Sequence, residues 1–196
     1  MRAAVMRDKK LVVDDIATPA PGAGEALVKT LACGICGSDL HTLKHADKLV
    51  ERSQRSGAPI TMDLARDIVM GHEFCAEIVD YGTQTQKRLK PGTRVCAMPV
   101  LIKSNGVEAV GYSNNNPGGY GELMRLTEFL LLEVPNGLST ERAALTEPMA
   151  VGYHAVQKAR LAKDDAPLVI GCGPVGLAVI AALKLGGVHP IVAADF

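Results

Sequence analysis

Residues 166–196 read APLVIGCGPVGLAVIAALKLGGVHPIVAADF, and this stretch decides how the end of the chain is expected to fold. An apolar run at 167–170 leads into a glycine-rich turn, a helix of small apolar residues at 177–185, and a second apolar run at 190–195. A strand, a helix and a second strand in this order are typical of a βαβ unit, which opens a parallel sheet. The sequence therefore predicts the first unit of a doubly wound α/β domain.

The turn of this unit carries the pattern G-x-G-x-x-G, and we assign its residues to cofactor binding: Gly171, Gly173, Pro174, Val175 and Gly176. Such glycines allow a tight turn, a close approach of a pyrophosphate to the backbone, and close packing of the helix on the strand. The N–H groups at the start of the helix would face the phosphates. The alternative is a tight turn that binds no ligand, but the flanking strand and helix favour the nucleotide site.

An acidic residue follows the second strand. Asp195 lies about 20 residues after the last glycine, where a carboxylate binds the ribose hydroxyls of a dinucleotide. The same carboxylate would repel a 2′-phosphate. The sequence therefore favours NAD over NADP.

The first three quarters of the chain read as short strands separated by turns. The candidate strands are 2–6, 10–16, 25–35, 74–82, 92–100 and 121–135. Strands at this spacing suggest an all-β barrel or sandwich. The pattern becomes helical in 139–161, with a bend expected at Pro148. We place a boundary between residues 150 and 165, and assign 1–155 and 156–196 to two domains.

One stretch within the β-rich part is predicted to be helical. Leu40, Leu43, Ala46 and Leu49 recur at helical spacing in 38–56. This pattern predicts an amphipathic helix after a Ser-Asp turn, with Ser38 or Asp39 near its N-cap, and then a loop to residue 67.

Composition excludes several classes of partner. Lys+Arg and Asp+Glu number 21 each, so the net charge is +0, which argues against nucleic acid or an anionic membrane surface as a partner. No stretch reaches the roughly 18 to 20 apolar residues of a membrane span, and the first segment shows no apolar core of signal-peptide length. We expect a cytoplasmic protein, in which thiols bind metal or do chemistry more often than they form disulfides.

Residues 29–45, KTLACGICGSDLHTLKH, hold two cysteines close together. Cys33 and Cys36 form a C-x-x-C pair. Taken alone, this spacing is compatible with a disulfide, a redox pair, half of a metal site, or two buried small residues.

Further metal-ligating residue types lie at separate points of the chain. GHE supplies His72 and Glu73, and TEPM supplies Glu147. With the thiol of Cys36, these side chains suit a catalytic zinc, which needs about three protein ligands and an open position. Spacing alone does not separate this site from a structural histidine.

Four motifs in one order, CGICGSDLH, GHE, EPMAVGYHA and GCGPVG, resemble those of the zinc-dependent medium-chain alcohol and polyol dehydrogenases. The similarity extends over essentially the whole chain. It implies a GroES-like β-barrel catalytic domain at 1–155 and a Rossmann NAD-binding domain at 156–196, of which only the first βαβ unit is present. It also implies hydride transfer between a small alcohol or polyol and NAD.

The resemblance assigns the ligands of one catalytic zinc. The family's zinc cysteine is followed by x-Ser/Thr-Asp and matches Cys36, so that Cys33 becomes a buried neighbour and no disulfide is expected. His72 matches the zinc histidine. Glu73 is in relatives either a zinc ligand or a residue that contacts a ligand. Glu147 stands where sorbitol- and threonine-type members have glutamate.

The resemblance also implies a path for the substrate proton. Zinc polarises the substrate oxygen, Ser38 contacts that oxygen, and the proton passes through the cofactor ribose toward His41. Asp39 is expected to orient a zinc ligand. Helix capping by Ser38 and Asp39 is compatible with these roles. Val151, in the EPMAVGYHA motif, is expected at the cofactor.

Two features depart from the family pattern. Many members carry four closely spaced cysteines that bind a structural zinc, but the corresponding stretch, 96–122, has only Cys96, and we expect no structural zinc. The chain also stops at Phe196, after two strands of a sheet that usually has about six. We expect the active form to be a longer polypeptide, assembled as a homodimer or homotetramer.

The leading hypothesis is therefore a zinc-dependent alcohol or polyol dehydrogenase that uses NAD. A zinc-free quinone or enoyl reductase of the same superfamily is one alternative, but Cys36, His72 and Glu147 argue against it. A non-catalytic zinc- or nucleotide-binding fragment is the other. These motifs do not identify the substrate.

Overall fold

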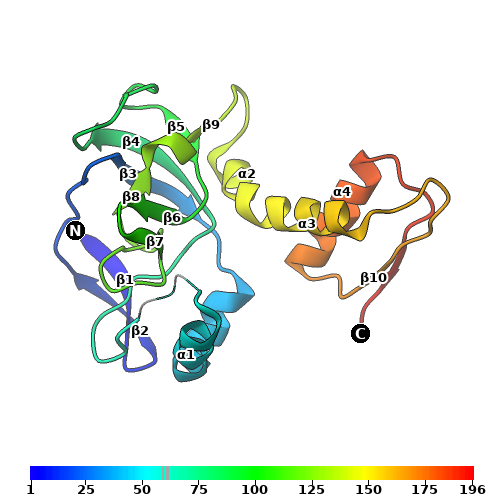
Figure 1. Ribbon diagram of the computed structural model, residues 1–196, viewed down its shortest axis with the longest axis horizontal. Coiled ribbons are helices and arrows are strands. Elements are labelled where there is room, and N and C mark those ends of the chain that lie inside the picture. Colours follow the sequence, from blue (N-terminus) through cyan, green and yellow to red (C-terminus); the bar gives the residue numbers. More distant parts are fainter. Residues whose placement is uncertain (59, 61) are drawn as a thin grey trace. The chain divides into compact units, whose positions relative to one another are not determined.

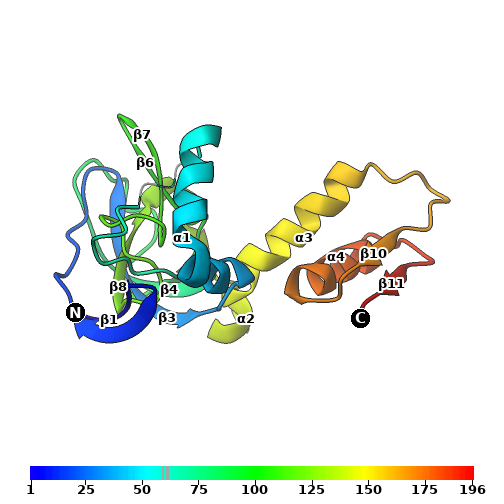
Figure 2. The ribbon, with the colours of Figure 1, turned by 90° about the horizontal axis from the view of Figure 1, so that it is seen from below.

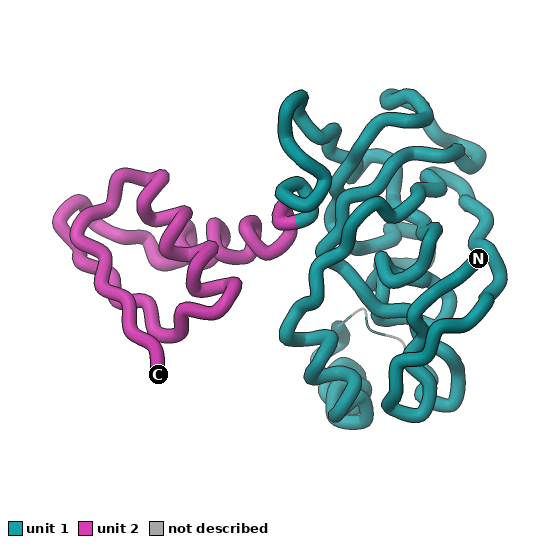
Figure 3. Tube along the Cα trace, turned by 180° about the vertical axis from the view of Figure 1, so that it is seen from behind, with its two compact units in different colours: residues 1–144 teal, residues 145–196 magenta. Residues whose placement is uncertain are grey.

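The computed structural model describes residues 1–58, 60 and 62–196, so residues 59 and 61 of the predicted loop lie outside the described part. The chain forms two compact units, Met1–Ala144 and Leu145–Phe196 (Figure 3). The boundary that we placed at residue 155 falls inside helix α3 (Thr146–Ala159). The compact units divide before this helix because α3 packs on helix α4 (Pro174–Leu185) of the βαβ unit.

The first unit is built from short strands (Figure 1). Five of them form a sheet in the order β8-β3-β4-β5-β9, in which all neighbours run antiparallel, and two further pairs form the hairpins β1–β2 and β6–β7. Their bounds are β1 Arg2–Arg7, β2 Lys10–Asp15, β3 Glu25–Cys33, β4 Phe74–Tyr81, β5 Arg94–Cys96, β6 Val100–Lys103, β7 Gly106–Ala109, β8 Leu123–Thr127 and β9 Leu132–Glu133. The β-rich character predicted for this part of the chain is confirmed.

The core of the sheet consists of apolar side chains that alternate along its strands. Val28, Ile78, Val95, Met124 and Leu126 are at most 1% exposed. Alternation places these side chains on one face, as expected for strands with one buried side. Burying each large apolar side chain contributes about 1.5–3 kcal/mol, so this face holds the sheet together.

Helix α1 (Gly37–Ser56) confirms the predicted helix but differs from it at the start (Figure 2). Its N-cap is Cys36, and Asp39 is the third helical residue, whose carboxylate accepts the Cys36 N–H at 3.1 Å. Asp39 therefore lies near the N-cap, as predicted, with its carboxylate hydrogen-bonded to the cap residue. Leu40 is 55% exposed, because the helix turns Asp39 inward instead.

The hairpin β6–β7 lies within 100–109, where no hairpin was predicted. The chain leaves the sheet after β5 and pairs Lys103 with Gly106 across a two-residue turn, Ser104-Asn105. Gly106, with φ +138°, is the first residue of β7, so the Asn-Gly pair does not occupy the two central turn positions in which it is a strong hairpin signal.

The single strand predicted over 121–135 is interrupted. A 3₁₀ turn, Glu128–Leu130, separates β8 from β9. The Glu128 side chain is buried, and its carboxylate accepts the backbone N–H groups of Gln86 at 2.7 Å and Arg88 at 3.3 Å. This inward carboxylate holds a neighbouring loop and breaks the strand.

The second unit contains the βαβ element that the opening stretch predicts. Strands β10 (Leu168–Ile170) and β11 (Val192–Ala194) pair in parallel, and α4 connects them. The helical stretch 139–161 is divided into α2 (Thr140–Ala144), in the first unit, and α3, in the second. None of the helices in the described part of the chain has the length and apolarity needed to cross a membrane.

We predict that Gly152→Ala destabilises the second unit. A Cβ on Gly152 would lie 2.6 Å from the Cβ and carbonyl carbon of Ala178, so α3 and α4 would have to move apart. Overpacking of this kind costs about 1–3 kcal/mol. Hydrogen exchange of the α3 and α4 amides would measure the loss. Gly37→Ala in α1 is the matched control, because a Cβ there meets nothing within 4 Å. Equal behaviour of the two variants would contradict the prediction.

Candidate metal and cofactor sites

Three of the predicted metal ligands meet in the first unit. Cys36 caps α1, and His72 and Glu73 directly precede β4. One ligand atom from each side chain lies within 4.8 Å of the other two. The site is sheltered, since Glu73 is buried and the His72 side chain is 11% exposed.

The pairing of β3 with β4 brings these residues together. Cys33, at the end of β3, pairs with Phe74, at the start of β4. The Gly34 N–H then donates to the Glu73 carbonyl oxygen at 2.7 Å. A Cβ on Gly34 would collide with Oε2 of Glu73, so the Glu73 side chain would have to move away from residue 34.

Cys33 is a separate thiol. None of the five cysteines is in a disulfide, and burial, followed by the nearby charge of Asp39, raises the pKa of Cys33 to about 12. Its thiol therefore stays protonated near neutral pH. The two cysteines of the C-x-x-C pair therefore have different environments. They do not form a disulfide, and of the two only Cys36 belongs to the metal-ligand cluster.

The carboxylate of Asp39 lies behind this cluster and is 2% exposed. Besides the Cys36 N–H, it accepts the hydroxyl protons of Tyr120 at 2.9 Å and Tyr112 at 3.0 Å. Burial raises the pKa of Asp39, but hydrogen bonding and the charge of His72 outweigh burial and hold the pKa below its usual range. Asp39 is thus an ionised acceptor next to a candidate ligand.

The His72 ring faces this carboxylate. Its Nδ1 lies 3.4 Å from Oδ1 of Asp39, an ion-pair distance without hydrogen-bond alignment. Burial lowers the pKa of His72, but Asp39 and Cys36 raise it more, to about 9. A thiol, a carboxylate and a buried imidazole held by a carboxylate form the donor set that zinc prefers, so the residues present fit this metal.

Ser38 and His41 occupy the first turns of α1. The Ser38 and Tyr112 hydroxyl oxygens are 2.9 Å apart. His41 is exposed, and its ring centroid is 4.8 Å from that of His45. Tyr112 and Tyr120 were missed by the sequence analysis, because no motif or spacing marks them.

Glu147 and Val151 belong to the second unit, where Glu147 lies in the first turn of α3 and Val151 follows one turn later. The metal-ligand cluster found among the described residues lies within the first unit and comprises Cys36, His72 and Glu73.

The glycine turn of the second unit has the features of a nucleotide-binding turn. Gly171 has φ +90°, a conformation that favours glycine, and a Cβ on Gly176 would collide with the Gly171 carbonyl oxygen. Gly173 is different, because its backbone is extended and a Cβ there would meet nothing within 4 Å. No packing within the described residues requires glycine at 173. The bare backbone there suits a bound phosphate group.

Asp195 lies beside this turn. One carboxylate oxygen accepts the Cys172 N–H at 2.8 Å, and the other accepts the N–H of Phe196. The hydrogen bond from the Phe196 N–H has the larger effect and that from the Cys172 N–H the smaller. Together they hold the pKa of Asp195 below its usual range. Pro174, at the first position of α4, and Val175 continue the turn into the helix.

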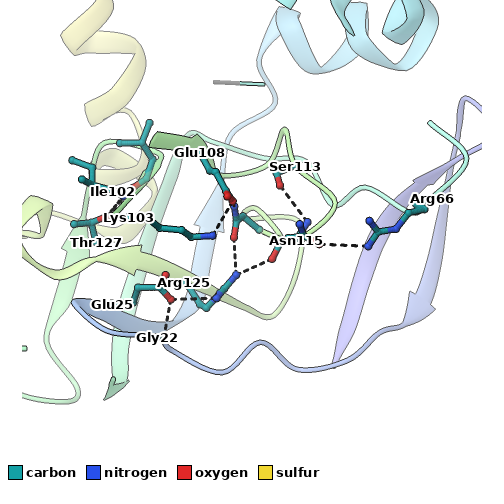
Figure 4. A network of polar contacts seen from close by, with 12 residues as sticks. Gly22, Glu25, Arg66, Ile102, Lys103, Glu108, Ser113, Asn115, Arg125 and Thr127 are labelled. Atoms are coloured by element: carbon teal, nitrogen blue, oxygen red, sulfur yellow. Dashed lines mark hydrogen bonds and ion pairs between the residues drawn. The ribbon is translucent and has the colours of Figure 1, made fainter. Parts of the chain in front are cut away.

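A polar network occupies the region where many family members carry four cysteines (Figure 4). Arg125, on β8, donates to Glu25 at 3.3 Å, to the Asn115 carbonyl oxygen at 2.8 Å and to the Asn116 side chain at 2.6 Å. Glu108, on β7, accepts from Asn116 as well as from Lys103. The network therefore fastens the loop before β8 to the sheet and to the hairpin.

Comparison with known proteins identifies the family. Residues 22–136 match the alcohol dehydrogenase GroES-like domain. The chain belongs to the zinc-type medium-chain alcohol and polyol dehydrogenases. The predicted family and the predicted combination of a GroES-like domain with the start of a Rossmann domain are confirmed.

Two curated relatives of the chain come from Bacillus subtilis. (R,R)-butanediol dehydrogenase is 35% identical, and the match covers 100% of the chain and 58% of the relative. Sorbitol dehydrogenase is 29% identical over 100% of the chain and 56% of the relative. The crystal structure of 2R,3R-butanediol dehydrogenase superimposes with a TM-score of 0.78, at 29% identity, over 99% of the chain and 62% of that structure. The chain thus spans a little more than half the length of these curated relatives.

We predict that the metal-free protein becomes less stable as the pH rises from about 6.5 to about 9. The folded-state pKa of His72 is raised to about 9, above its ordinary value of 6.5. Between these values the folded state holds more protons than the unfolded state, so the stabilisation is complete below pH 6.5 and is lost as the pH passes 9. Urea unfolding at a series of pH values, with the metal removed by a chelator, would measure this change in the free energy of unfolding.

Other groups also titrate in this range, so the control is His72→Gln. The difference in unfolding free energy between the parent and this variant should shrink as the pH rises. A difference that stays constant from pH 6.5 to pH 9 would contradict the assigned pKa.

Proposed function

We propose that the whole protein is a zinc-dependent oxidoreductase that transfers a hydride between an alcohol or polyol and NAD. The observation that carries this proposal is the convergence of Cys36, His72 and Glu73 on one sheltered point, with Asp39 behind His72. A glycine turn followed by an acidic residue supplies the cofactor half. The names of the relatives support alcohols and polyols as the substrate class.

In this proposal Cys36, His72 and Glu147 hold one catalytic zinc, and Glu73 is a ligand or supports one. Zinc, when bound there, would supply Lewis-acid polarisation of the substrate oxygen. Asp39 keeps the His72 ring oriented. We also propose that the segment 96–122 binds no structural zinc.

The remaining residues handle the proton and the cofactor. Ser38 takes the proton of the substrate hydroxyl, and exposed His41 passes it to solvent after transfer through the ribose. The turn residues Gly171, Gly173, Pro174, Val175 and Gly176 bind the pyrophosphate, and Val151 contacts the cofactor.

The wider context of the protein follows from the same family. We propose a cytoplasmic homodimer or homotetramer, with the domain assignment 1–155 and 156–196 retained as a functional division. The walls of the substrate pocket and the rest of the cofactor site would be formed by a segment that corresponds to the unmatched part of the relatives.

We predict about one zinc ion per chain, lost on Cys36→Ser or His72→Ala together with alcohol oxidation. Each change removes one donor of the set that a catalytic zinc needs. Metal analysis by mass spectrometry and NADH formation with a panel of alcohols and polyols would measure both effects. Cys172→Ser makes the same chemical change outside the cluster and should keep the zinc. Two tightly held zinc ions, or full activity without zinc, would overturn this part of the proposal.

We predict that Asp195→Ala lowers the preference for NAD over NADP at least about tenfold, which corresponds to about 1.4 kcal/mol. The substitution removes the carboxylate that would repel a 2′-phosphate. The ratio of kcat/KM values for the two cofactors would measure the change. Asp164→Ala removes a carboxylate from an exposed position away from the turn, and should leave the ratio unchanged. A parent enzyme that prefers NADP would show that Asp195 has another role.

A further inference from the structure

His45 has no part in the proposed zinc site or proton path, although it ends the stretch 29–45 that contains Cys36. It lies four residues after His41 on α1, and the centroids of the two rings are 4.8 Å apart, with the ring planes tilted by 51°. The backbone of His45 departs from helical geometry, with φ −135° and ψ 35°, and the two rings are nevertheless in contact. The imidazoles of α1 therefore form a pair of their own.

Neither imidazole of this pair is engaged elsewhere. Among the described residues, no hydrogen bond or ion pair joins the side chain of His41 or His45 to another residue. His41 is exposed, and the ring nitrogens of half-buried His45 are not among the buried polar atoms that lack a partner, so both rings present their nitrogens to solvent. Two histidines four residues apart on one helix are a recurring pair of zinc ligands.

The separation of the two rings fits a single metal ion between them. A bond of about 2.0–2.1 Å from zinc to an imidazole nitrogen puts the ion about 3.2 Å from the ring centroid. The centroids of two rings on one ion are then about 4.5 Å apart when the bonds meet at a right angle, and about 5.2 Å apart at the tetrahedral angle. The observed 4.8 Å lies between these values.

We propose that His41 and His45 form a second metal site, which binds zinc when the catalytic site is already filled. The two imidazoles supply two ligands, and water completes the coordination. The exposed side chains of Lys44 and Lys48 lie on the same helix, and their positive charges oppose a cation. Two ligands and two opposing charges make this site weaker than the cluster at Cys36, so it fills only in an excess of zinc.

Occupation of this site blocks the proposed proton path. An imidazole passes a proton on by accepting it at one ring nitrogen and releasing another from the second nitrogen. A metal ion on either nitrogen of His41 takes a lone pair that this transfer needs. Excess zinc is therefore expected to inhibit alcohol oxidation. The inhibition rests on the proposed function, because it requires His41 to carry the proton, whereas the binding of zinc to the pair does not.

The test uses the whole protein with zinc already bound at the Cys36 cluster, at about pH 8, where free imidazole is deprotonated. Isothermal titration calorimetry with zinc chloride measures the Kd of additional zinc, and NADH formation from an alcohol in the same buffer measures inhibition. His45→Gln should weaken the binding of additional zinc at least about tenfold, since even groups that only support a metal ligand contribute this much. The activity without additional zinc should stay unchanged in this variant, and its inhibition by zinc should be lost.

His154→Gln is the matched control. It makes the same chemical change at an exposed position of helix α3, and it should alter neither the Kd of additional zinc nor the inhibition. Magnesium chloride at the same concentration should not inhibit, because magnesium prefers oxygen ligands. If the His45→Gln protein does not fold, NMR spectra of the parent replace it. The ring proton signals of His41 and His45 should then shift together over the same range of zinc concentration.

The outcomes separate the metal site from the proposed function. If additional zinc does not bind, or if it binds equally to the parent and to His45→Gln, the site at His41 and His45 is overturned and the proposed function stands. Zinc that binds the pair without slowing alcohol oxidation would overturn the blocked proton path. A zinc-loaded protein that oxidises no alcohol would overturn the proposed function, while calorimetry would still decide whether the pair binds zinc.

Discussion

The buried carboxylate of Asp39 is the constraint on which the arrangement of the first unit depends. Removing an ion from water costs several kcal/mol, so a carboxylate that is 2% exposed must be paired or hydrogen-bonded. It accepts the backbone N–H of Cys36 and the hydroxyl protons of Tyr112 and Tyr120, and the His72 ring lies at ion-pair distance. Satisfying one charge therefore joins the start of α1, the segment before β4 and the loop before β8. The same arrangement places the Cys36 thiol beside His72.

The features that the sequence predicted well depend on local pattern. The βαβ unit could be predicted because its periodicity and its glycine turn lie within 166–196. Gly171 and Gly176 are explained by the conformation and packing of this turn, whereas Gly173 is the N-cap of α4 and has no packing constraint from the described residues. Cys36 and His72 could be selected because few residue types bind zinc and because their motifs occur in the order typical of one family.

The features that were missed depend on tertiary structure. Leu40 fits the apolar stripe of α1, but the phase of the helix is set by Asp39, which must point inward to reach its donors. Tyr112 and Tyr120 lie in an irregular loop, where neither period nor motif distinguishes a half-buried tyrosine with a hydrogen-bonded hydroxyl from any other aromatic residue. The interruption at Glu128 has the same origin, because a buried carboxylate that holds a distant loop has no local signal.

In the proposed zinc site, Cys36 and His72 together with both glutamates would make four protein ligands. A tetrahedral catalytic zinc would then have no open position, so the proposal requires one of the two carboxylates to leave a position for the substrate oxygen. The Glu73 side chain lies against Gly34 and its backbone carbonyl accepts the Gly34 N–H, so residue 73 is held next to this glycine. A side chain at residue 34 would fill the space that Glu73 now uses. The glycine of the C-x-x-C pair thus matters for the ligand that faces it as well as for the turn that it forms.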